Sequence, residues 1–463
     1  MSTAYDEIPY ANLPFTQALP RGHATIAMLH GLAPQDPRTA RVLELGCGAG
    51  AHLVGVAAAH PEVQAVGVDL AATAIETARA DAAAAGLENV RFDVADVLEL
   101  TDGRLGEFDY VIVHGLYAWA AEPLREAVLE ACRAHLAPAG IAYVSYNAHP
   151  GGHLRQMLRE MAQWHARGLA DPREEAERAR GLFALLDRFG EADGRTFFAG
   201  VLGEEVKALA SAPEPMFVHD LLASTFVPVW FTDFAAAAAR HGLAYVGDAI
   251  PGASREAPWS EAVEAFVAEG AGDDRVAREQ YFDLFVLRRF RHSLLCHDAQ
   301  SPSARVDAAA VPRLLVAPDG DPAELPGPLR AALDGAGPRR PVAFADLRRR
   351  TGVPEEELAA QLVAGFDVGD VEFHAVPPPA AAAAGERPRA SALARSQARP
   401  GAIVTTLLSQ VVRVTDEPTG ALLRLLDGTR DRAAILEAFP GPLSAEALDG
   451  ALAKFAALGL LFE

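Results

Sequence analysis

The chain has 463 residues, of which half are hydrophobic and 22% are charged, a composition typical of a globular protein with large cores. At roughly 150 residues per domain, this length predicts about three domains. The 62 acidic residues outnumber the 41 basic ones and give a formal net charge of −21. Because an acidic surface repels polyanions, this charge disfavours a protein whose main activity is to bind DNA or RNA.

The three cysteines, Cys47, Cys132 and Cys296, are too few and too widely spaced for a disulfide framework or a zinc knuckle. Such a set is typical of a reducing cytoplasm. Residues 1–7 hold no basic region followed by an apolar run, so we expect no signal peptide. No apolar run of about 18 residues predicts a membrane span. We therefore expect a cytoplasmic protein with no membrane partner; the sequence does not decide between a monomer and a homodimer.

The first third of the chain alternates short apolar runs with helical patterns. Strands separated by helices of about 10–15 residues predict right-handed βαβ units and a parallel sheet. We expect strands over residues 41–45, 64–69, 90–94, 108–113 and 141–146, and helices over 49–59, about 72–86 and about 122–136. The predicted fold class is α/β, with a Rossmann-like cofactor-binding domain over residues 1–155.

The pattern changes after residue 155, and we predict a second, mixed domain over residues 156–300. Residues 155–212 carry apolar residues three and four apart, which predicts two or three helices. Residues 213–297 mix helices with short strands. Within them, the apolar side chains from Tyr281 to Leu294 fall at roughly helical spacing, and we interpret them as a core-facing stripe.

The last third of the chain is predicted to hold two small units and two linkers. Residues 301–327 and 377–401 are rich in Pro and Ala and predict linkers, the second of them solvated and disordered. Residues 328–376 predict a small helical unit. Residues 402–463 predict three helices and a closing strand, a plan that resembles a winged helix. This last unit has five basic and eight acidic residues, so we expect a protein-contact or intramolecular role for it, not DNA binding.

The strongest local signal is the run Glu44-Leu45-Gly46-Cys47-Gly48-Ala49-Gly50, directly after a predicted strand and before a predicted helix. Its glycines let the chain turn sharply and let a ligand lie against bare backbone. The helix N-terminus behind them offers free N–H groups. Taken alone, this loop also fits the dinucleotide-binding pattern.

Three carboxylates favour S-adenosylmethionine over a dinucleotide. Glu44 lies beside the loop, where it would repel a pyrophosphate but hold a cationic amino group, which S-adenosylmethionine carries. Asp69 ends the second predicted strand, 23 residues after Gly46, and can accept hydrogen bonds from both ribose hydroxyls. Asp96 follows the third strand and is placed to accept a hydrogen bond from the adenine amino group.

Further motifs give the sequence a family resemblance. The glycine loop, Val66–Asp69, Phe108–Ile112 and Leu136–Gly140 resemble the successive motifs of class I S-adenosylmethionine-dependent methyltransferases. The chain resembles, more narrowly, the methyltransferases with a methyltransferase regulatory domain, a group that includes bacterial protein lysine methyltransferases. The motifs that carry this narrower resemblance are Tyr5–Tyr10, Pro14–Gln17, His114–Trp119, Ser145–Asn147, Phe234–Gly242 and Phe290–His297.

Together, the motifs and the resemblance imply a set of site residues. The expected cofactor-binding residues are Tyr5, Tyr10, Phe15, Glu44, Gly46, Cys47, Gly48, Gly50, Asp69, Leu70, Asp96, Val97 and His114. An amine acceptor must arrive neutral, and a dry pocket with a tyrosine or carboxylate nearby can remove its proton. Our catalytic candidates are therefore Tyr10, His114, Tyr117 and Tyr146, with Trp119 and Asn147 as further candidates for the pocket.

Several readings of the function stay open at this point. The first is methyl transfer to a protein or peptide, with a lysine amine as the expected acceptor. The second keeps the enzyme but changes the acceptor to a small metabolite or a peptide precursor, and the third is a non-catalytic scaffold that senses the cofactor. His149 and His153 are not expected to bind a metal, because the Pro-Gly-Gly between them opposes a helical arrangement and no Cys lies near.

Overall fold

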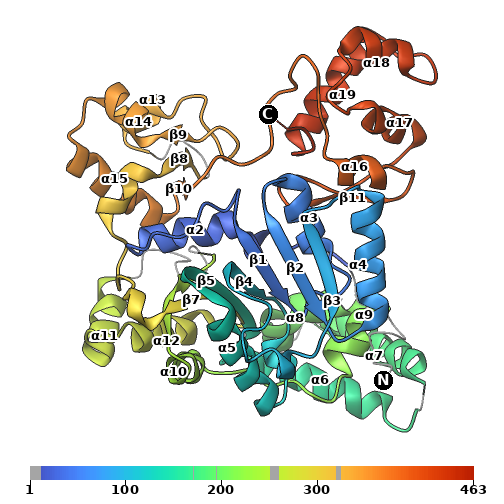
Figure 1. Ribbon diagram of the computed structural model, residues 1–463. Coiled ribbons are helices and arrows are strands. Elements are labelled where there is room, and N and C mark those ends of the chain that lie inside the picture. The colour runs from blue at the N-terminus through green and yellow to red at the C-terminus, as the bar shows by residue number, and fades with distance from the viewer. Residues whose placement is uncertain (1–11, 170, 194–195, 251–259, 320–324, 463) are drawn as a thin grey trace.

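The computed structural model describes residues 12–169, 171–193, 196–250, 260–319 and 325–462, with the backbone alone for residues 189–201 (Figure 1). A seven-stranded sheet with the order β3-β2-β1-β4-β5-β7-β6 forms its centre. The first five strands are parallel, whereas β7 is antiparallel to both β5 and β6. The strands are β1 (Arg41–Leu45), β2 (Gln64–Asp69), β3 (Val90–Val94), β4 (Phe108–Val113), β5 (Leu136–Asn147), β6 (Leu243–Asp248) and β7 (Phe290–His297). The predicted α/β class and parallel sheet are confirmed.

Helices cover both faces of this sheet, as alternation along its strands requires. Val42 of β1 joins the core on one face and Leu43 the core on the other. The helices of the first face are α2 (Pro20–Leu29), α3 (Ala51–Ala59) and α4 (Ala72–Ala84), and those of the second are α5 (Glu122–His135) and α10 (Phe231–Arg240). Short 3₁₀ turns η1 (Thr16–Ala18), η2 (Val97–Glu99) and η3 (Tyr117–Trp119) lie in the connections.

The middle part of the chain divides into a helical layer and two strands of the first sheet. The layer has its own core around Leu158, Phe183, Val206 and Phe217. It consists of α6 (Gly152–Ala166), α7 (Pro172–Asp193), α8 (Thr196–Ala210), α9 (Glu214–Met216) and the π-helical turn η4 (Phe217–Leu221). Figure 1 places this layer at the end of the sheet toward which the parallel strands point. The predicted boundary at residue 155 therefore does not separate two independent sheets.

The apolar stripe predicted from Tyr281 to Leu294 is not one helix. Helix α12 (Arg275–Val286), which follows α11 (Glu261–Ala271), ends at Leu287, whose φ of 48° is left-handed. The chain then enters β7, and Leu284, Phe285 and Leu287 stay exposed. The spacing of these apolar residues fits one helix and a helix followed by a strand equally well. The tertiary structure decides for the strand, because β7 pairs between β5 and β6.

A buried ion cluster fixes this change of direction. Arg291 of β7 is fully buried, and its Nε donates to Asp283 of α12 over 2.8 Å. Arg288 donates to the same carboxylate over 3.1 Å, and Glu279 lies 3.1 Å from the Arg291 guanidinium. Since an uncompensated buried charge is costly, α12 and β7 hold one relative position.

The predicted linker at 301–327 is wrong, because its described residues form structure. The turn η7 (Ala308–Arg313) and strand β8 (Leu315–Pro318) pack into the same core as α2. Strand β8 pairs with β9 (Val342–Ala343) and β10 (Val371–His374), so the unit predicted as helical contains a small antiparallel sheet. Its helices are α13 (Gly327–Ala332), α14 (Phe344–Thr351) and α15 (Glu355–Val368), and the short turn η6 (Asp298–Gln300) precedes it.

The second predicted linker, 377–401, is also packed. Ala380, Ala390 and Leu393 are buried, and Ala390 pairs with Leu461 near the end of the chain. The C-terminal unit contains α16 (Ala392–Gln397), β11 (Ile403–Thr405), β12 (Val411–Arg413), α17 (Glu417–Leu425), α18 (Arg432–Ala438) and α19 (Ala445–Ala457). Alanine-rich composition predicted disorder here, but small side chains also allow close packing against neighbouring elements.

The ion cluster yields the first testable prediction. Replacing Asp283 by Ala leaves Arg291 buried without its main partner, and we expect the free energy of unfolding to fall by about 3 kcal/mol or more. Urea denaturation measures this change. The matched control is Glu264→Ala, which removes a half-exposed partner of Arg278 and should cost under about 1 kcal/mol. Equal losses in the two variants would contradict the assigned role of the cluster.

Candidate active site

A cleft of about 960 Å³ opens at the carboxyl ends of the parallel strands. Open α/β sheets bind ligands at this edge, where the strand order reverses between β1 and β4. Glu44, Asp69, Asp96, His114 and Asn147, each at or just after one of the five parallel strands, line the cleft. Among the described residues, those that line it all lie between Asn12 and Phe290, so the last third of the chain contributes none.

The glycine-rich loop between β1 and α3 forms the floor at one end of the cleft. Gly48 has a φ of 54° and open space where a Cβ would stand, so a ligand can lie directly against its backbone. Gly50 does not line the cleft but closes the turn: its φ is 77°, and a Cβ there would come within 2.8 Å of Phe92 and 2.7 Å of Ala78. The predicted loop is present, with Gly50 in a structural place behind it.

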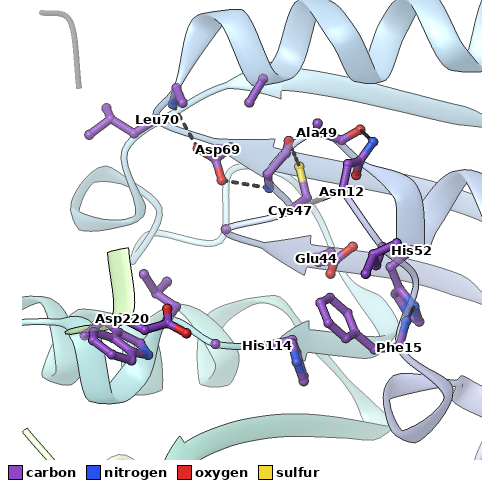
Figure 2. A pocket seen from close by; sticks show the side chains of 18 of the residues that line it. Asn12, Phe15, Glu44, Cys47, Ala49, His52, Asp69, Leu70, His114 and Asp220 are labelled. Atoms are coloured by element: carbon purple, nitrogen blue, oxygen red, sulfur yellow. Dashed lines mark hydrogen bonds between the residues drawn. The ribbon is translucent and has the colours of Figure 1, made fainter. Parts of the chain in front are cut away.

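Glu44 is the most unusual group of the cleft. Its side chain is 2% exposed, and Oε2 is buried without a hydrogen-bond partner. Burial, with a smaller effect from the charge of Asp69, raises the pKa of this carboxyl well above its ordinary value. Figure 2 shows it between the glycine loop and Phe15. An unsatisfied buried acceptor of this kind is stabilised by a cationic donor that enters the cleft.

Asp69 and Asp96 are held in place by the backbone around them. Asp69 accepts hydrogen bonds from the N–H of Gly48 at 2.8 Å and of Ala71 at 2.9 Å (Figure 2). Asp96 caps η2 by accepting from the N–H of Leu98 at 3.0 Å. Both carboxylates keep further lone pairs for a ligand, and Leu70 and Val97 line the cleft beside them.

The N-terminal segment is fastened to the loop. The amide of Asn12 donates to the carbonyl of Ala49 over 3.1 Å, and its Oδ1 accepts from the N–H of Ala51 over 2.9 Å. The N–H of Phe15 donates to Nδ1 of His52 over 3.4 Å, and the Phe15 ring stacks on His114 at 3.8 Å. Residues 12–15 therefore form one wall of the cleft. Tyr5 and Tyr10, two of the predicted site residues, lie outside the described residues.

His114 is placed in the cleft but is a weak base. Its Nδ1 lies 2.9 Å from the Tyr143 hydroxyl and 3.2 Å from that of Ser145. Burial above all, with the nearby His292 and His52, lowers its pKa to about 3. The imidazole is therefore neutral at physiological pH and can accept or donate a hydrogen bond to a ligand.

The other catalytic candidates do not reach the cleft. Tyr117 and Tyr146 are buried behind its wall and pack against Phe234, and neither lines the cavity. Burial raises the pKa of Tyr117 to about 12 and that of Tyr146 well above its ordinary value. This placement does not favour either phenol as a proton acceptor. Burial likewise raises the pKa of Cys47, which keeps it a thiol.

Trp119 and Asn147 do line the cleft. Trp119 packs on Phe226 at 4.9 Å, so it combines packing with contact. The rings of His149 and His153 stack with their centroids 4.0 Å apart. Within the described part of the chain, no three His, Cys, Asp or Glu side chains gather as metal ligands, and no helix there is long and apolar enough to span a bilayer.

The far wall of the cleft consists of residues that the sequence did not single out. Arg155 of α6, Glu205 of α8, Asp220 of η4 and Arg289 come from separate segments of the middle part. Figure 2 shows Asp220 on the side of the cleft opposite Phe15 and His52. None of the four belongs to a motif, and the tertiary structure alone brings them together.

These residues fit the predicted cofactor. The orphaned acceptor of Glu44 suits the amino group of S-adenosylmethionine, the bare backbone at Gly48 suits its close approach, and Asp69 and Asp96 lie where ribose and adenine would need acceptors. A pyrophosphate would meet three carboxylates at this end of the cleft instead of a cation. The cleft therefore belongs to the Rossmann-like class of sites that bind an adenosine cofactor without a diphosphate.

Three family models match separate parts of the chain. Residues 42–140 match a methyltransferase domain, residues 214–297 a predicted methyltransferase regulatory domain, and residues 386–456 the C-terminal winged helix domain named for PKMT. The last match begins inside the segment predicted as a linker, in agreement with its packing.

The chain is also similar to two curated proteins and to a solved structure. The chain is 32% identical over 231 residues to the uncharacterized protein RP028 of Rickettsia prowazekii, covering 50% of this chain and 92% of that protein. It is 32% identical over 296 residues to the uncharacterized protein RP789 of the same organism, covering 64% of this chain but 52%, about half, of that relative. The structure of PKMT2 from Rickettsia typhi in complex with AdoHcy matches with a TM-score of 0.82 at 24% identity, over 98% of this chain and 100% of that one; at this identity it shows the fold.

The chain belongs to the family of S-adenosylmethionine-dependent methyltransferases that carry a methyltransferase regulatory domain. The family predicted from the sequence, its cofactor and the C-terminal winged helix are thereby confirmed.

The orphaned carboxylate gives a prediction for cofactor binding. We expect Glu44→Gln to weaken binding of S-adenosylmethionine by about 10- to 100-fold, because it removes a charge-assisted hydrogen bond. The free protein should lose no stability, because a buried, unpaired carboxylate disappears. Calorimetric titration and thermal melting measure the two quantities.

The control for this variant is Glu76→Gln, an exposed carboxylate on the outer side of α4. Since pairing with an ammonium group favours the charged form of Glu44, binding should also release a proton, and the cofactor affinity should rise with pH. An unchanged affinity in Glu44→Gln would exclude the assigned contact.

The hydrogen bonds of the N-terminal segment give a second prediction for cofactor binding. We expect Asn12→Ala to weaken cofactor binding by about 5- to 10-fold, because it removes both hydrogen bonds that join the N-terminal segment to the glycine-rich loop and the start of α3. Asn12→Asp keeps the acceptor for Ala51 but loses the donor to Ala49, and should give an intermediate affinity. Equal affinities in wild type and Asn12→Ala would show that the loop keeps its shape without this tether.

Proposed function

We propose that the protein transfers a methyl group from S-adenosylmethionine to a lysine amine of a protein acceptor. The observation that carries this proposal is the extent of the cleft, which runs from Glu44 at the cofactor end to Arg155, Glu205 and Asp220 on the helical layer of α6–α9 and η4. A second wall, built by another part of the chain, provides a place for an acceptor beside the cofactor. The relatives support a protein acceptor, because the winged helix model and the similar solved structure both carry the name PKMT.

The chemistry requires alignment more than a strong base. When bound, the cofactor supplies a methyl group on a positively charged sulfur, and an amine attacks it in line with the bond that breaks. Holding both partners in this geometry accounts for most of the acceleration in such displacements. Glu44, Asp69 and Asp96 fix one partner, and the stacked Phe15 and His114 form a rigid wall beside it.

The proton of the acceptor leaves before the attack. A lysine ammonium must become a neutral amine, and transfer from water into a partly dry cleft lowers its pKa. The neutral His114 can hold the amine by a hydrogen bond but, with a pKa of about 3, cannot store its proton at physiological pH. Water therefore takes the proton, and the rate should rise with pH until the bound lysine is fully neutral. The three cysteines are buried and free, which supports action in a reducing cytoplasm.

The test of this function uses the purified protein, S-adenosylmethionine labelled in the methyl group, and a lysate of its own host that lacks the gene. We expect label in one or a few protein bands, and mass spectrometry should place it on lysine. The control is Glu44→Gln at a cofactor concentration near the wild-type dissociation constant, where labelling should fall in proportion to occupancy.

Other results would reject the proposal in defined ways. Label confined to the small-molecule fraction would show a metabolite acceptor, and label on a short peptide would show a precursor. Confirmed cofactor binding without transfer to lysates or to lysine peptides would show a cofactor-sensing scaffold.

A further inference from the structure

The far wall of the cleft carries two acids and two arginines in one group. Arg155 stands between the acids, with a guanidinium nitrogen 3.7 Å from a carboxylate oxygen of Glu205 and another 3.7 Å from one of Asp220. Arg289 forms an ion pair with Glu205. We refer to Arg155, Glu205, Asp220 and Arg289 as the charge quartet. All four line the same cleft as the cofactor-binding residues.

The backbone that carries Asp220 is held from α6. Arg155, Arg159 and Gln163 lie four residues apart and therefore share one face of this helix. Arg159 donates to the carbonyls of Asp220 and Ala223, and Gln163 donates to the carbonyl of Leu221 over 3.2 Å. Because two side chains of α6 hold this backbone and a third meets its carboxylate, Asp220 is fixed before any acceptor arrives.

The two arginines of the quartet differ in their freedom. The Arg155 side chain is 16% exposed, whereas that of Arg289 is 56% exposed. The backbone of Arg289 is fixed, since its carbonyl accepts from the N–H of Ala148 over 2.9 Å, and the neighbouring Arg288 carbonyl accepts from Gly151 over 2.8 Å. The guanidinium of Arg289 can therefore separate from Glu205 by rotation of its side chain, while the backbone stays in place. This guanidinium is the cation that an incoming one can replace.

The charge of the whole cleft favours a positive acceptor. Apart from Glu44, which we expect to pair with the amino group of the cofactor, its lining contains four carboxylates, Asp69, Asp96, Glu205 and Asp220, against the two arginines of the quartet. Burial keeps His114 and His52 neutral by lowering their pKa values to about 3 and about 4. Trp119, Leu154 and Phe290 add apolar surface that suits the methylene stem of a long cationic side chain.

We propose that Glu205 and Asp220 form the cation subsite that selects a lysine-bearing acceptor, with Arg155 as the positioning residue and Arg289 as an internal cation that the acceptor displaces. This inference rests on the proposed function and deepens it. The subsite receives a basic side chain of the acceptor next to the target lysine, whose own amine must be neutral when it attacks. The same carboxylates would repel an acidic segment.

The experiment compares peptides of opposite charge, and variants for which we expect opposite changes in peptide affinity. The probe is a fluorescein-labelled Gly/Ser decapeptide with two lysines, matched to one with norleucine and one with glutamate in place of lysine. Binding is measured by fluorescence anisotropy with S-adenosylhomocysteine present, and KM by methyl transfer. We expect Glu205→Gln and Asp220→Asn to raise both the dissociation constant and the KM of the lysine peptide by about 3- to 10-fold.

Arg289→Met should change the same quantities in the opposite direction, by about 2- to 5-fold, because it removes the competing cation. The matched control is Glu204→Gln, which deletes one negative charge from the exposed side of the same helix α8. Binding of S-adenosylmethionine and the melting temperature should stay at their wild-type values in all four variants. If the ion pairs were only structural, the substitutions would lower the melting temperature, and peptide affinity would not fall in the acid variants and rise in Arg289→Met.

Each remaining outcome decides one of the two proposals. If the lysine peptide is methylated but its dissociation constant and KM are the same in all variants, the cation subsite is overturned and the proposed function stands. A reversed pattern, with tighter binding of the glutamate peptide and loss of affinity in Arg289→Met, overturns the subsite in favour of an anion-binding one. The predicted pattern in anisotropy without any transfer supports the subsite and overturns the proposed function.

Discussion

The antiparallel pairing of β7 with β5 is the constraint on which the rest of the structure depends. It places Phe290 beside Asn147, which are far apart in the sequence, and so joins the regulatory part to the edge of the parallel sheet. Without an outside partner, β5 would present open backbone groups. The buried pair of Arg291 and Asp283 then fixes where α12 ends and where the strand begins. Arg289 and Phe290 reach the cleft because of this pairing.

The cleft itself is electrostatically incomplete without a cation. A carboxylate that is nearly fully buried and lacks a partner destabilises the free protein, and the raised pKa of Glu44 expresses that cost. The neighbouring aspartates differ, since backbone N–H groups already hold Asp69 and Asp96. The site thus combines two carboxylates that the backbone already holds with one buried carboxylate that lacks a partner. The carboxylates of Glu205 and Asp220 extend along the same cleft, so the proposed acceptor subsite would use the same physical property as the cofactor end.

The C-terminal third of the chain acts at a distance from this chemistry. Its last part packs on the outer side of α3, where Ala59 meets Ala380 and Leu407, and Arg339 links the two units of this third by donating to the carbonyls at the end of α19. Figure 1 shows it beyond the amino ends of the strands, away from α6–α9. This contact explains why eight of the nine residues of α3 are buried, since a helix that is apolar on all sides needs cover on all sides.

The sequence by itself determined the parallel strands, the glycine-rich loop and the three carboxylates of the cofactor end, because each of these depends on residues close together along the chain. Strand and helix periods, the left-handed glycines and an acid at or just after the end of each of the first three strands are local properties. The linkers, the fate of the stripe after Tyr281 and the depth of Tyr117 and Tyr146 were decided only by tertiary packing. Apolar spacing does not state which neighbour will cover a surface, and alanine-rich composition does not separate disorder from close contact. The charge quartet was beyond sequence reasoning for the same reason, because its members come from three helical segments and a strand edge that only the folded sheet brings to one wall.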